Sequence, residues 1–467
     1  MKKILVVGFA LLVSALNAAW KYDPDAKTLT DGVLIFNAIL ANDNELSVDA
    51  TDGHFAGDSV PETFSIDFTT ISDTDDKQYV VVKFGDFSYV NGNYFKAYAD
   101  RLTEFIAPDC KNIFGNGCFG ACNQLTKVEL NEEVTFSSDR PFVDCSSLSD
   151  FSPRTLLITA FKTQFFSGCR SLAGEIKLPN CTSIAAKAFS GCSKLEKVSM
   201  PKVTAIEGQA FYLCSSLREV ETSGSLTKIK STAFSGCTSL RGDCIRELLH
   251  QGITMLGSSN EDIKTIFEGC SSFDGVLEWD FPNITTYKYQ GVSYPINLVG
   301  QGFFSGCSKL EKVVFKTPVL EIRNSAFKEI APGAEFYAPD TVPESLGASF
   351  VGNLTGPFPK FICSEETLEE YLEKIGVNHH VILKSQFNTD LGQEFEYTTG
   401  KYRKWKDIAA KMATDTQMCE LTGDEITLKR KGVVAFVLQK STNQQLTSLV
   451  GFWVMKAAKK GFSIKVR

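Results

Sequence analysis

One short motif recurs along this chain at nearly constant spacing. It reads "AFSGCSKLEKV" from Ala188, "AFYLCSSLREV" from Ala210 and "AFSGCTSLRGD" from Ala233. The repeated phenylalanines are Phe119, Phe142, Phe166, Phe189, Phe211, Phe234, Phe267, Phe304 and Phe327. Successive members lie 23, 24, 23, 22, 23, 33, 37 and 23 residues apart. A period of this length predicts a solenoid, in which each repeat forms one turn and contacts only its neighbours.

Two further positions repeat with the phenylalanine. A cysteine follows three residues after each of the first eight, at Cys122, Cys145, Cys169, Cys192, Cys214, Cys237, Cys270 and Cys307. Three residues later stands a leucine, or Phe273 in one copy, and the ninth copy has Ile330 in place of cysteine. The next residues alternate between apolar and polar, as in "TKVEL" and "EKVSM". This pattern predicts one short parallel strand per turn of about 23 residues, with one face buried.

The repeat resembles that of the BspA-like bacterial leucine-rich repeat proteins, whose pattern is roughly Ile-x4-Ala-Phe-x-x-Cys-x-x-Leu-x-x-Val-x-Leu-Pro. The resemblance covers about Arg101 to Ala338, and "KFICSEETLEEYLEKIGV" from Lys360 looks like a degenerate closing unit. It implies a β-rich α/β leucine-rich-repeat solenoid, curved, with its parallel sheet on the concave face. Members of the family are largely secreted or surface proteins and several serve adhesion. The long segments before Phe267 and Phe304 depart from the pattern.

Equivalent positions of a solenoid lie above one another, so the cysteines are expected to form a column. Parallel strands are about 4.8 Å apart, which falls within the Cα separation of about 4.4–6.8 Å that a disulfide tolerates. Side chains in one column point the same way, however, and a bridge would distort the disulfide dihedral angle. We therefore expect a ladder of buried free thiols that donate to carbonyl groups. The other six cysteines cannot be paired from sequence: Cys110, Cys118, Cys181, Cys244, Cys363 and Cys419.

The outward positions of the predicted strands form two columns. One contains Lys127, Asp150, Glu175, Lys197, Glu219, Asp243, Val276 and Lys312. The other contains Glu129, Ser152, Lys177, Ser199, Glu221, Ile245, Glu278 and Val314. The charges are mixed and aromatic residues are absent. These columns are typical either of a solvated surface or of a polar protein-binding face.

The tripeptide Arg241–Gly242–Asp243 has the form of an integrin attachment motif. In the repeat alignment "SLRGDC" occupies the same place as "SLAGEI" and "SFDGVL". Because a glycine recurs there, we interpret Gly242 as a backbone requirement at the entry to the strand rather than as part of an attachment site.

Two insertions lengthen the repeat. The first, "CIRELLHQGITMLGSSNED" from Cys244, predicts one short helix closed by Gly252. The second, from Thr285, carries Tyr287, Tyr289 and Tyr294. Inserted loops often bind partners, and tyrosine suits recognition surfaces. These three residues are our candidate binding loop, and the alternative is a loop folded back over the edge of the repeat.

The two ends of the chain differ from the repeats. Residues 1–19 predict a signal peptide, because two lysines precede an apolar run that ends near Ala18 and Ala19. A membrane anchor would need about 20 apolar residues. Residues 20–100 predict a β-rich cap over the solenoid, which spans 101–377. Residues 378–467 predict a small α+β domain, with a helix in "GKYRKWKDIAAKM" and strands in "GVVAFVLQ", "VGFWVM" and "FSIKV".

The sequence shows no motif for catalysis. Its four histidines are His54, His250, His379 and His380. The last two lack a partner at metal-ligand spacing, and "DATDG" and "SDTDDK" lack the spacing of a calcium loop. No nucleophile elbow, phosphate loop or dinucleotide fingerprint is present. We expect no catalytic residue, no cofactor and no metal.

These observations favour an exported, non-enzymatic monomer that acts outside the cell or on its surface. Its expected partner is a protein or another extracellular macromolecule. Nucleic acid is disfavoured by the net charge of −7, and no membrane span is expected once the signal peptide is removed. Two alternatives stay open, a structural component of the envelope without a specific ligand and a hydrolase hidden in an end domain.

Overall fold

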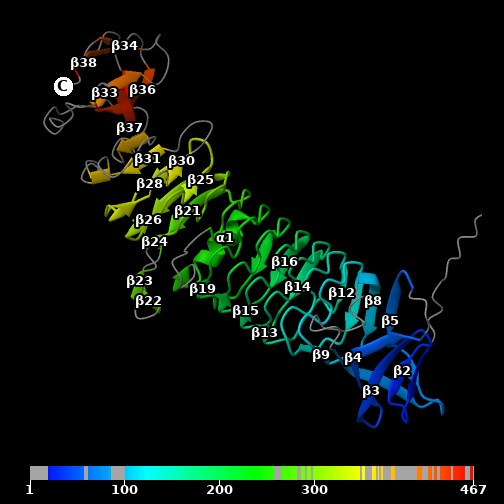
Figure 1. The fold of residues 1–467 in the computed structure, drawn as a ribbon. Helices are drawn as coiled ribbons and strands as arrows, with labels where there is room; N and C mark the ends of the chain where they lie inside the picture. The colour runs from blue at the N-terminus through cyan, green and yellow to red at the C-terminus, as the bar shows by residue number, and fades with distance from the viewer. Residues whose placement is uncertain are drawn as a thin grey trace, which may run out of the picture. The chain divides into compact units, whose positions relative to one another are not determined.

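The computed structural model describes most of the repeat region and the strands beyond it. The described residues are 19–56, 61–85, 100–256, 265–280, 286–289, 292–295, 298–347, 350–352, 360–363, 367, 370–371, 380–383, 408–412, 419–422, 425–428, 432–442, 445–457 and 463–465. The predicted signal peptide lies outside them apart from its last residue. The chain forms two compact units, Met1–Asn180 and Cys181–Arg467 (Figure 1). The predicted domain boundaries at residues 19, 100 and 377 stay predictions.

The first unit begins with seven strands that extend the repeat. They are β1 (Trp20–Asp23), β2 (Thr28–Thr30), β3 (Leu34–Asn42), β4 (Glu45–Phe55), β5 (Phe64–Asp67), β6 (Ile71–Ser72) and β7 (Gln78–Gly85). β5 pairs in parallel with β8 (Leu102–Ala107), and β7 pairs in parallel with β9 (Asn112–Phe114). An unpaired strand edge would otherwise be exposed at the first turn. The predicted β-rich cap is therefore joined to the repeats by backbone pairing.

Regular turns contain two strands rather than the single strand that was predicted. A main strand follows the repeat leucine, and a second strand of two or three residues forms at the next apolar position. In the first unit the remaining main strands are β10 (Lys127–Leu130), β12 (Asp150–Ser152) and β14 (Gly174–Lys177), and the second strands are β11 (Thr135–Phe136) and β13 (Ala160–Phe161). A two-residue strand is too short to show alternation, which explains why the sequence pattern missed it.

The second unit repeats this arrangement with one helix inserted. Its main strands are β16 (Leu195–Ser199), β18 (Glu219–Glu221), β21 (Gly275–Trp279), β25 (Leu310–Phe315), β28 (Glu335–Tyr337), β31 (Lys360–Cys363) and β32 (His380–Leu383). Its second strands are β15 (Ser183–Ile184), β17 (Ala205–Ile206), β19 (Lys228–Ile229), β20 (Met255–Leu256), β24 (Leu298–Val299), β26 (Glu321–Ile322) and β29 (Ser345–Leu346). Beside them, β27 (Phe327–Lys328) pairs with β30 (Val351–Gly352). The helix is α1 (Gly242–Leu249), which confirms the predicted helix, and Gly252 follows it at φ +70°.

The repeated phenylalanines form stacked columns inside each unit. In the first unit Phe84, Phe119, Phe142 and Phe166 stack with ring centroids 5.9, 5.2 and 5.6 Å apart. In the second, Phe189, Phe211, Phe234, Phe267, Phe304 and Phe327 follow at 5.3, 5.2, 5.5, 5.7 and 5.4 Å. All these rings are fully buried. The predicted aromatic column is confirmed within each unit, and it passes through both insertions of the second unit.

A third set of backbone hydrogen bonds runs beside the phenylalanines, and we call it the phenylalanine ladder. The amides of seven repeated phenylalanines donate to the carbonyl of the residue before the next one, as from Phe211 to Ala233 at 2.8 Å. The amide two residues later does the same, as from Leu213 to Ser235 at 2.8 Å. That position has a positive φ and is often glycine, for example Gly236 at +79°. Glycine recurs here because it adopts this conformation without steric cost.

The cysteine column consists of buried free thiols, as predicted. Six of these thiols donate to the carbonyl of the phenylalanine one turn earlier. The Sγ–O distances are 2.9 Å for Cys145, 3.1 Å for Cys169, 3.0 Å for Cys214, 3.1 Å for Cys237, and 3.3 Å for Cys270 and Cys307. Cys110, Cys118, Cys181 and Cys244 are also free and buried, whereas the side chains of Cys363 and Cys419 lie outside the described residues.

The strands beyond residue 400 correct one prediction. They are β33 (Ile408–Met412), β34 (Cys419–Thr422), β35 (Glu425–Leu428), β36 (Gly432–Thr442), β37 (Gln445–Ala457) and β38 (Ser463–Lys465). The helix predicted in "GKYRKWKDIAAKM" is wrong at Ile408–Met412, because this segment pairs antiparallel with β36. Pairing with a long neighbouring strand overrides the local preference of alanine, lysine and methionine for helix. The three predicted strands are confirmed. In the described part of the chain, no helix has the length and apolar character needed to cross a membrane.

Candidate binding surface

The outward face of the main strands is built by simple alternation. In β16 and β18 the valines Val198 and Val220 point inward and are buried, while Lys197 and Glu219 lie on the outward side. Parallel pairing places Lys197 beside Glu219 and Ser199 beside Glu221. The same register joins Lys127 to Asp150 in the first unit and Val276 to Lys312 further along the second. The predicted columns are therefore confirmed in these strands.

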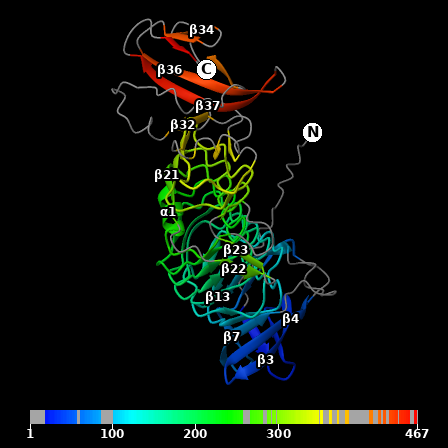
Figure 2. The same ribbon diagram turned by 90° about the vertical axis from the view of Figure 1, so that its left-hand side faces the viewer.

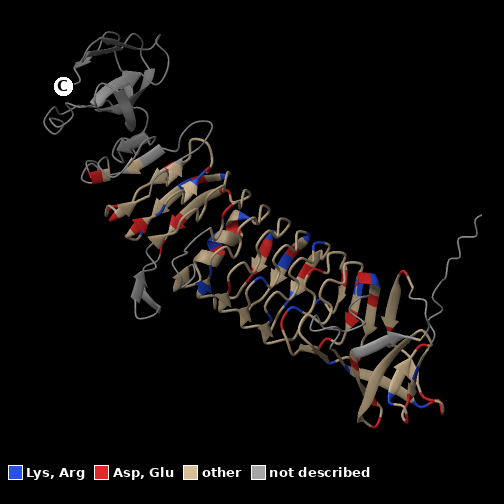
Figure 3. Cartoon of the chain, viewed as in Figure 1, with Lys and Arg blue, Asp and Glu red and all other residues tan. Residues whose placement is uncertain are grey.

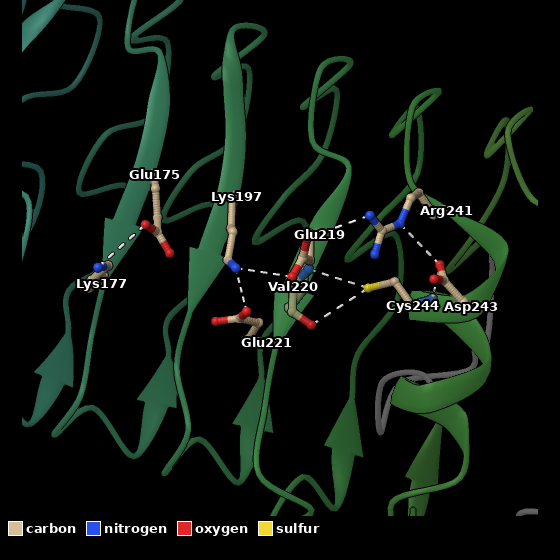
Figure 4. A network of polar contacts seen from close by, with 9 residues as sticks. All are labelled: Glu175, Lys177, Lys197, Glu219, Val220, Glu221, Arg241, Asp243 and Cys244. Atoms are coloured by element: carbon tan, nitrogen blue, oxygen red, sulfur yellow. Dashed lines mark hydrogen bonds and ion pairs between the residues drawn. The ribbon is translucent and has the colours of Figure 1, made fainter.

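The outward charges of β16 and β18 are paired with each other. The ammonium of Lys197 contacts Glu219 at 3.0 Å and also contacts Glu221, as Figure 4 shows. The guanidinium of Arg241 lies 3.7 Å from the second oxygen of Glu219. The hydrogen bonds to Glu221 and Glu219 raise the pKa of Lys197, and the bond from Lys197 lowers the pKa of Glu221. A face whose charges are already satisfied offers little attraction to a charged partner.

The first unit pairs its outward charges along single strands. Lys127 lies 3.4 Å from Glu129, and Lys177 lies 3.6 Å from Glu175. These side chains are about a third to a half exposed, and ion pairs this exposed contribute about 0–1 kcal/mol. Figure 3 shows the mixture of basic and acidic residues on these strands. This part of the surface fits a solvated face better than a charged binding site.

The outward face changes in β21, β25 and β28. Val276 is 37% exposed, and Val314 and Tyr337 are half-buried. The ammonium of Lys312 lies 4.3 Å from the ring centre of Tyr337 and 3.9 Å from Glu335. Burial raises the pKa of Tyr337 to about 12, and Glu335 adds to the shift. Apolar, aromatic and cationic groups thus lie side by side, a combination that is common at protein interfaces.

The tripeptide Arg241–Gly242–Asp243 begins helix α1 instead of a strand. The strand predicted at Asp243 and Ile245 is wrong, and Ile245 is buried. The sequence "CIRELL" places its apolar residues on one face at helical spacing, which overrides the strand pattern of the other repeats. The sequence pattern predicts the helix but places its first residues in the strand column.

The charged ends of the same tripeptide are engaged with the chain itself. The Arg241 Nε donates to the Asp243 carboxylate at 3.2 Å, and that carboxylate accepts the backbone amide of Cys244 at 2.8 Å. A Cβ on Gly242 would lie 2.8 Å from the backbone oxygen of Asp274. The glycine is needed for close approach, whereas Gly174 and Gly275 have positive φ values at strand entry. The predicted backbone requirement at the entry to the strand therefore holds for Gly174 and Gly275. Gly242 is required for a different reason, the close packing against Asp274.

The three tyrosines of the candidate loop belong to a β-hairpin. It is formed by β22 (Thr286–Tyr289) and β23 (Val292–Pro295), which are drawn in Figure 1. Tyr287 pairs with Tyr294, and Tyr289 pairs with Val292. Positions two apart in a strand share a face, so the register assigns all three tyrosine positions to the same face of the hairpin. Their side chains lie outside the described residues, and their role stays a prediction.

The described residues contain no group of histidine, cysteine and acidic side chains that could hold a metal ion. In the segment "SDTDDK", the carboxylate of Asp73 accepts the amides of Asp75 and Lys77 at 2.9 and 3.0 Å and the hydroxyl of Tyr79 at 2.8 Å. These bonds lower the pKa of Asp73 although burial opposes the shift. Asp73 therefore shapes a turn. In the segment "DATDG" the side chains of residues 51–53 lie outside the described residues, as does His379.

Comparisons with known proteins agree with this architecture. A family model described as "BspA type Leucine rich repeat region" matches in six copies, over residues 88–202, 159–251 and 260–353. These ranges cover more than half of the chain. A search of curated proteins finds no match.

Three solved structures are similar to this chain at low identity. One is a leucine-rich cell surface protein from Faecalibacterium prausnitzii A2-165, at 19% identity and a TM-score of 0.42, over 78% of this chain and 98% of that chain. A leucine-rich repeat protein from Bacteroides ovatus ATCC 8483 has 16% identity and a TM-score of 0.41, over 74% and 98%. The leucine-rich repeat protein of T. pallidum has 21% identity and a TM-score of 0.36, over 47% and 94%. The repeat pattern, the phenylalanine and cysteine columns and the family match together establish that this chain belongs to the BspA-type leucine-rich repeat family.

Proposed function

We propose that this protein is exported and binds other proteins at the cell surface or outside the cell, without catalysing a reaction. Membership of a repeat family with extended binding surfaces supports this function. We also propose that it acts as a monomer and does not bind nucleic acid. The apolar run after Lys2 and Lys3 supports export through a signal peptide.

The change of character along the outward face carries this proposal. In β16 and β18 the charges satisfy one another. In β21, β25 and β28, Val276 is exposed beside Lys312, and the ammonium of Lys312 lies over the ring of Tyr337. The tyrosine hairpin is inserted in the same repeat as β21. Aromatic residues are enriched at interfaces. We propose that Tyr287, Tyr289 and Tyr294 contact the partner.

A capture experiment with the purified exported chain tests this proposal. The probe is a surface-protein extract from cells that share its environment, and the retained proteins are identified by mass spectrometry and then titrated. Saturable retention of a defined protein supports a binding function, and no saturable retention contradicts it. The triple variant Tyr287→Ala, Tyr289→Ala, Tyr294→Ala should lose this retention.

The matched control lies on the same hairpin. Lys288 and Ser293 are paired across the two strands, at positions that alternate with the tyrosines. The double variant Lys288→Ala, Ser293→Ala should bind as the wild type does. Equal binding by both variants would show that the hairpin does not contact the partner. The outward face with Val276 and Tyr337 would then be the candidate binding site.

Fractionation of the producing cells tests localisation separately. The mature chain should appear in the surface or extracellular fraction, and its N-terminal sequence should begin close to residue 20. A chain that stays in the cytoplasm with Met1 intact would contradict export, whatever the binding result.

A further inference from the structure

Two of the three backbone ladders of the second unit are interrupted at the same place. The main strands form one stack that ends at β18 and another that runs from β21 to β32, with α1 between them. The second strands form a stack that ends at β20 and another that begins at β24. Because β20 and β24 lie in successive turns, they are the strands that an uninterrupted ladder would pair. Among the residues that the structure describes, these two neighbouring turns therefore lack strand pairing on two sides.

The phenylalanine ladder is what continues across this place. The amide of Phe234 donates to the carbonyl of Ile266 at 3.0 Å, and that of Gly236 donates to Glu268 at 2.7 Å. The rings of Phe234 and Phe267 stack at 5.5 Å. The same bonds and rings are present between the regular turns, where two strand ladders support them. Here the two strand ladders are replaced by the amide of Ser272 and the hydroxyl of Ser271, which donate to the carbonyl of Thr238 at 3.1 and 3.3 Å.

Side chains of α1 take the place of the missing main strand. The thiol of Cys244 accepts the amide of Val220 at 3.3 Å and donates to its carbonyl at 3.6 Å, as Figure 4 shows. On the other side, Arg246 Nη1 donates to the carbonyls of Asp274 at 2.8 Å and Val276 at 3.4 Å. In Figure 2, α1 and β21 follow one another along the same side of the unit. A single arginine thus joins the helix to the edge of the next stack.

We infer that the second unit contains a joint between the turn of α1 and β20 and the turn of β21 and β24. The stability of a solenoid is approximately a sum of terms for neighbouring repeats, and local opening begins where these terms are weakest. The two stacks separate at the joint before either of them unfolds. The hydrogen bonds from Arg246 to Asp274 and Val276 limit this opening.

Hydrogen exchange of the full chain, followed by residue-resolved mass spectrometry, tests this inference. The amides of Phe234 and Gly236 cross the joint. Those of Phe189 and Gly191 make the same bonds, to Ala210 and Tyr212, between turns that both strand ladders connect. We expect the first pair to exchange roughly tenfold faster than the second. The amides of Phe267 and Gly269 donate to the carbonyls of Phe303 and Ser305 within the stack that begins at β21. They should exchange as slowly as the second pair.

A substitution of Arg246 and a matched control complete the test. Arg246→Ala should accelerate exchange at Phe234 and Gly236 by a further fivefold or so, with no change at Phe189. The control is Arg218→Ala, which removes an exposed arginine whose ion pair with Glu196 spans 3.9 Å. Equal exchange at Phe189, Phe234 and Phe267 in the wild type would overturn the joint. So would an Arg246→Ala variant that accelerates exchange evenly along the unit.

Discussion

The regular turns and the enlarged turns of the second unit solve the same packing problem differently. Between Phe189 and Phe234 every turn adds two paired strands, one ring and one thiol, and the outward charges neutralise one another. Between Phe234 and Phe304 the ring column continues, but both strand ladders are interrupted once, and the outward strand position becomes apolar at Val276. The comparison indicates that the buried column maintains the fold, while the backbone ladders can be given up where inserted segments serve another purpose.

The largest expected effect comes from the element that both regions share. Phe211 is fully buried and stacks on Phe189 and Phe234. Phe211→Ala should lower the free energy of unfolding by about 3–5 kcal/mol, because the lost burial is compounded by a cavity. Urea denaturation measures the loss, and Tyr212→Ala at the half-buried neighbour is the control. A stability equal to that of the wild type would refute the column as the source of stability.

The thiol column predicts a loss of stability in alkali. Burial raises the pKa of Cys110 and Cys244 to about 12, whereas thiols of the unfolded chain titrate near about 8.5. Folded thiols therefore keep their protons where unfolded ones lose them. The stabilising contribution is complete below about pH 8.5 and declines as the pH rises toward 12. The melting temperature should be level up to pH 8 and fall above pH 9.

A serine at Cys244 isolates this contribution from the titration of tyrosine and lysine. Serine has a similar shape and does not titrate in this range. Between pH 8 and pH 10 the Cys244→Ser variant should lose about 2 kcal/mol less stability than the wild type, because one thiol proton no longer favours the unfolded chain. If the stability of the two proteins fell equally between pH 8 and pH 10, this thiol would not be responsible for the loss of stability in alkali.

A smaller effect is expected where glycine accommodates a neighbouring turn. Gly236 has φ +79°, and a Cβ there would lie 2.6 Å from Cδ2 of Leu213, which is itself 49% exposed at φ +58°. Gly236→Ala should cost about 1–2 kcal/mol from the left-handed conformation, with a further cost from displacing Leu213. Combining it with Leu213→Gly should remove the second part only. Additive effects of the two substitutions would argue against contact between them.

The sequence could predict what repeats and not what interrupts the repeat. The spacing of phenylalanine and cysteine was sufficient to predict the aromatic column and the thiol column, because the same residues recur at the same positions in successive turns. Phe84 joins the aromatic column from a cap strand without an accompanying cysteine, so no motif marks it. The helix at Gly242–Leu249 displaced an aligned strand, and the breaks beside it depend on pairing between turns. The tyrosine positions were visible in the sequence, but their hairpin register required backbone coordinates.

The smallest expected effect concerns the paired charges of the regular turns. Lys197 is about 30% exposed and contacts both Glu219 and Glu221. Lys197→Met keeps the aliphatic stem and removes the charge, and should cost about 1 kcal/mol or less, with a smaller difference in 1 M salt. Capture of a partner should be unchanged, since these charges are already neutralised within the sheet. If Lys197→Met abolished capture while stability stayed constant, the regular face would be the binding site. The regular turns would then serve recognition, and the enlarged turns would not be the binding region.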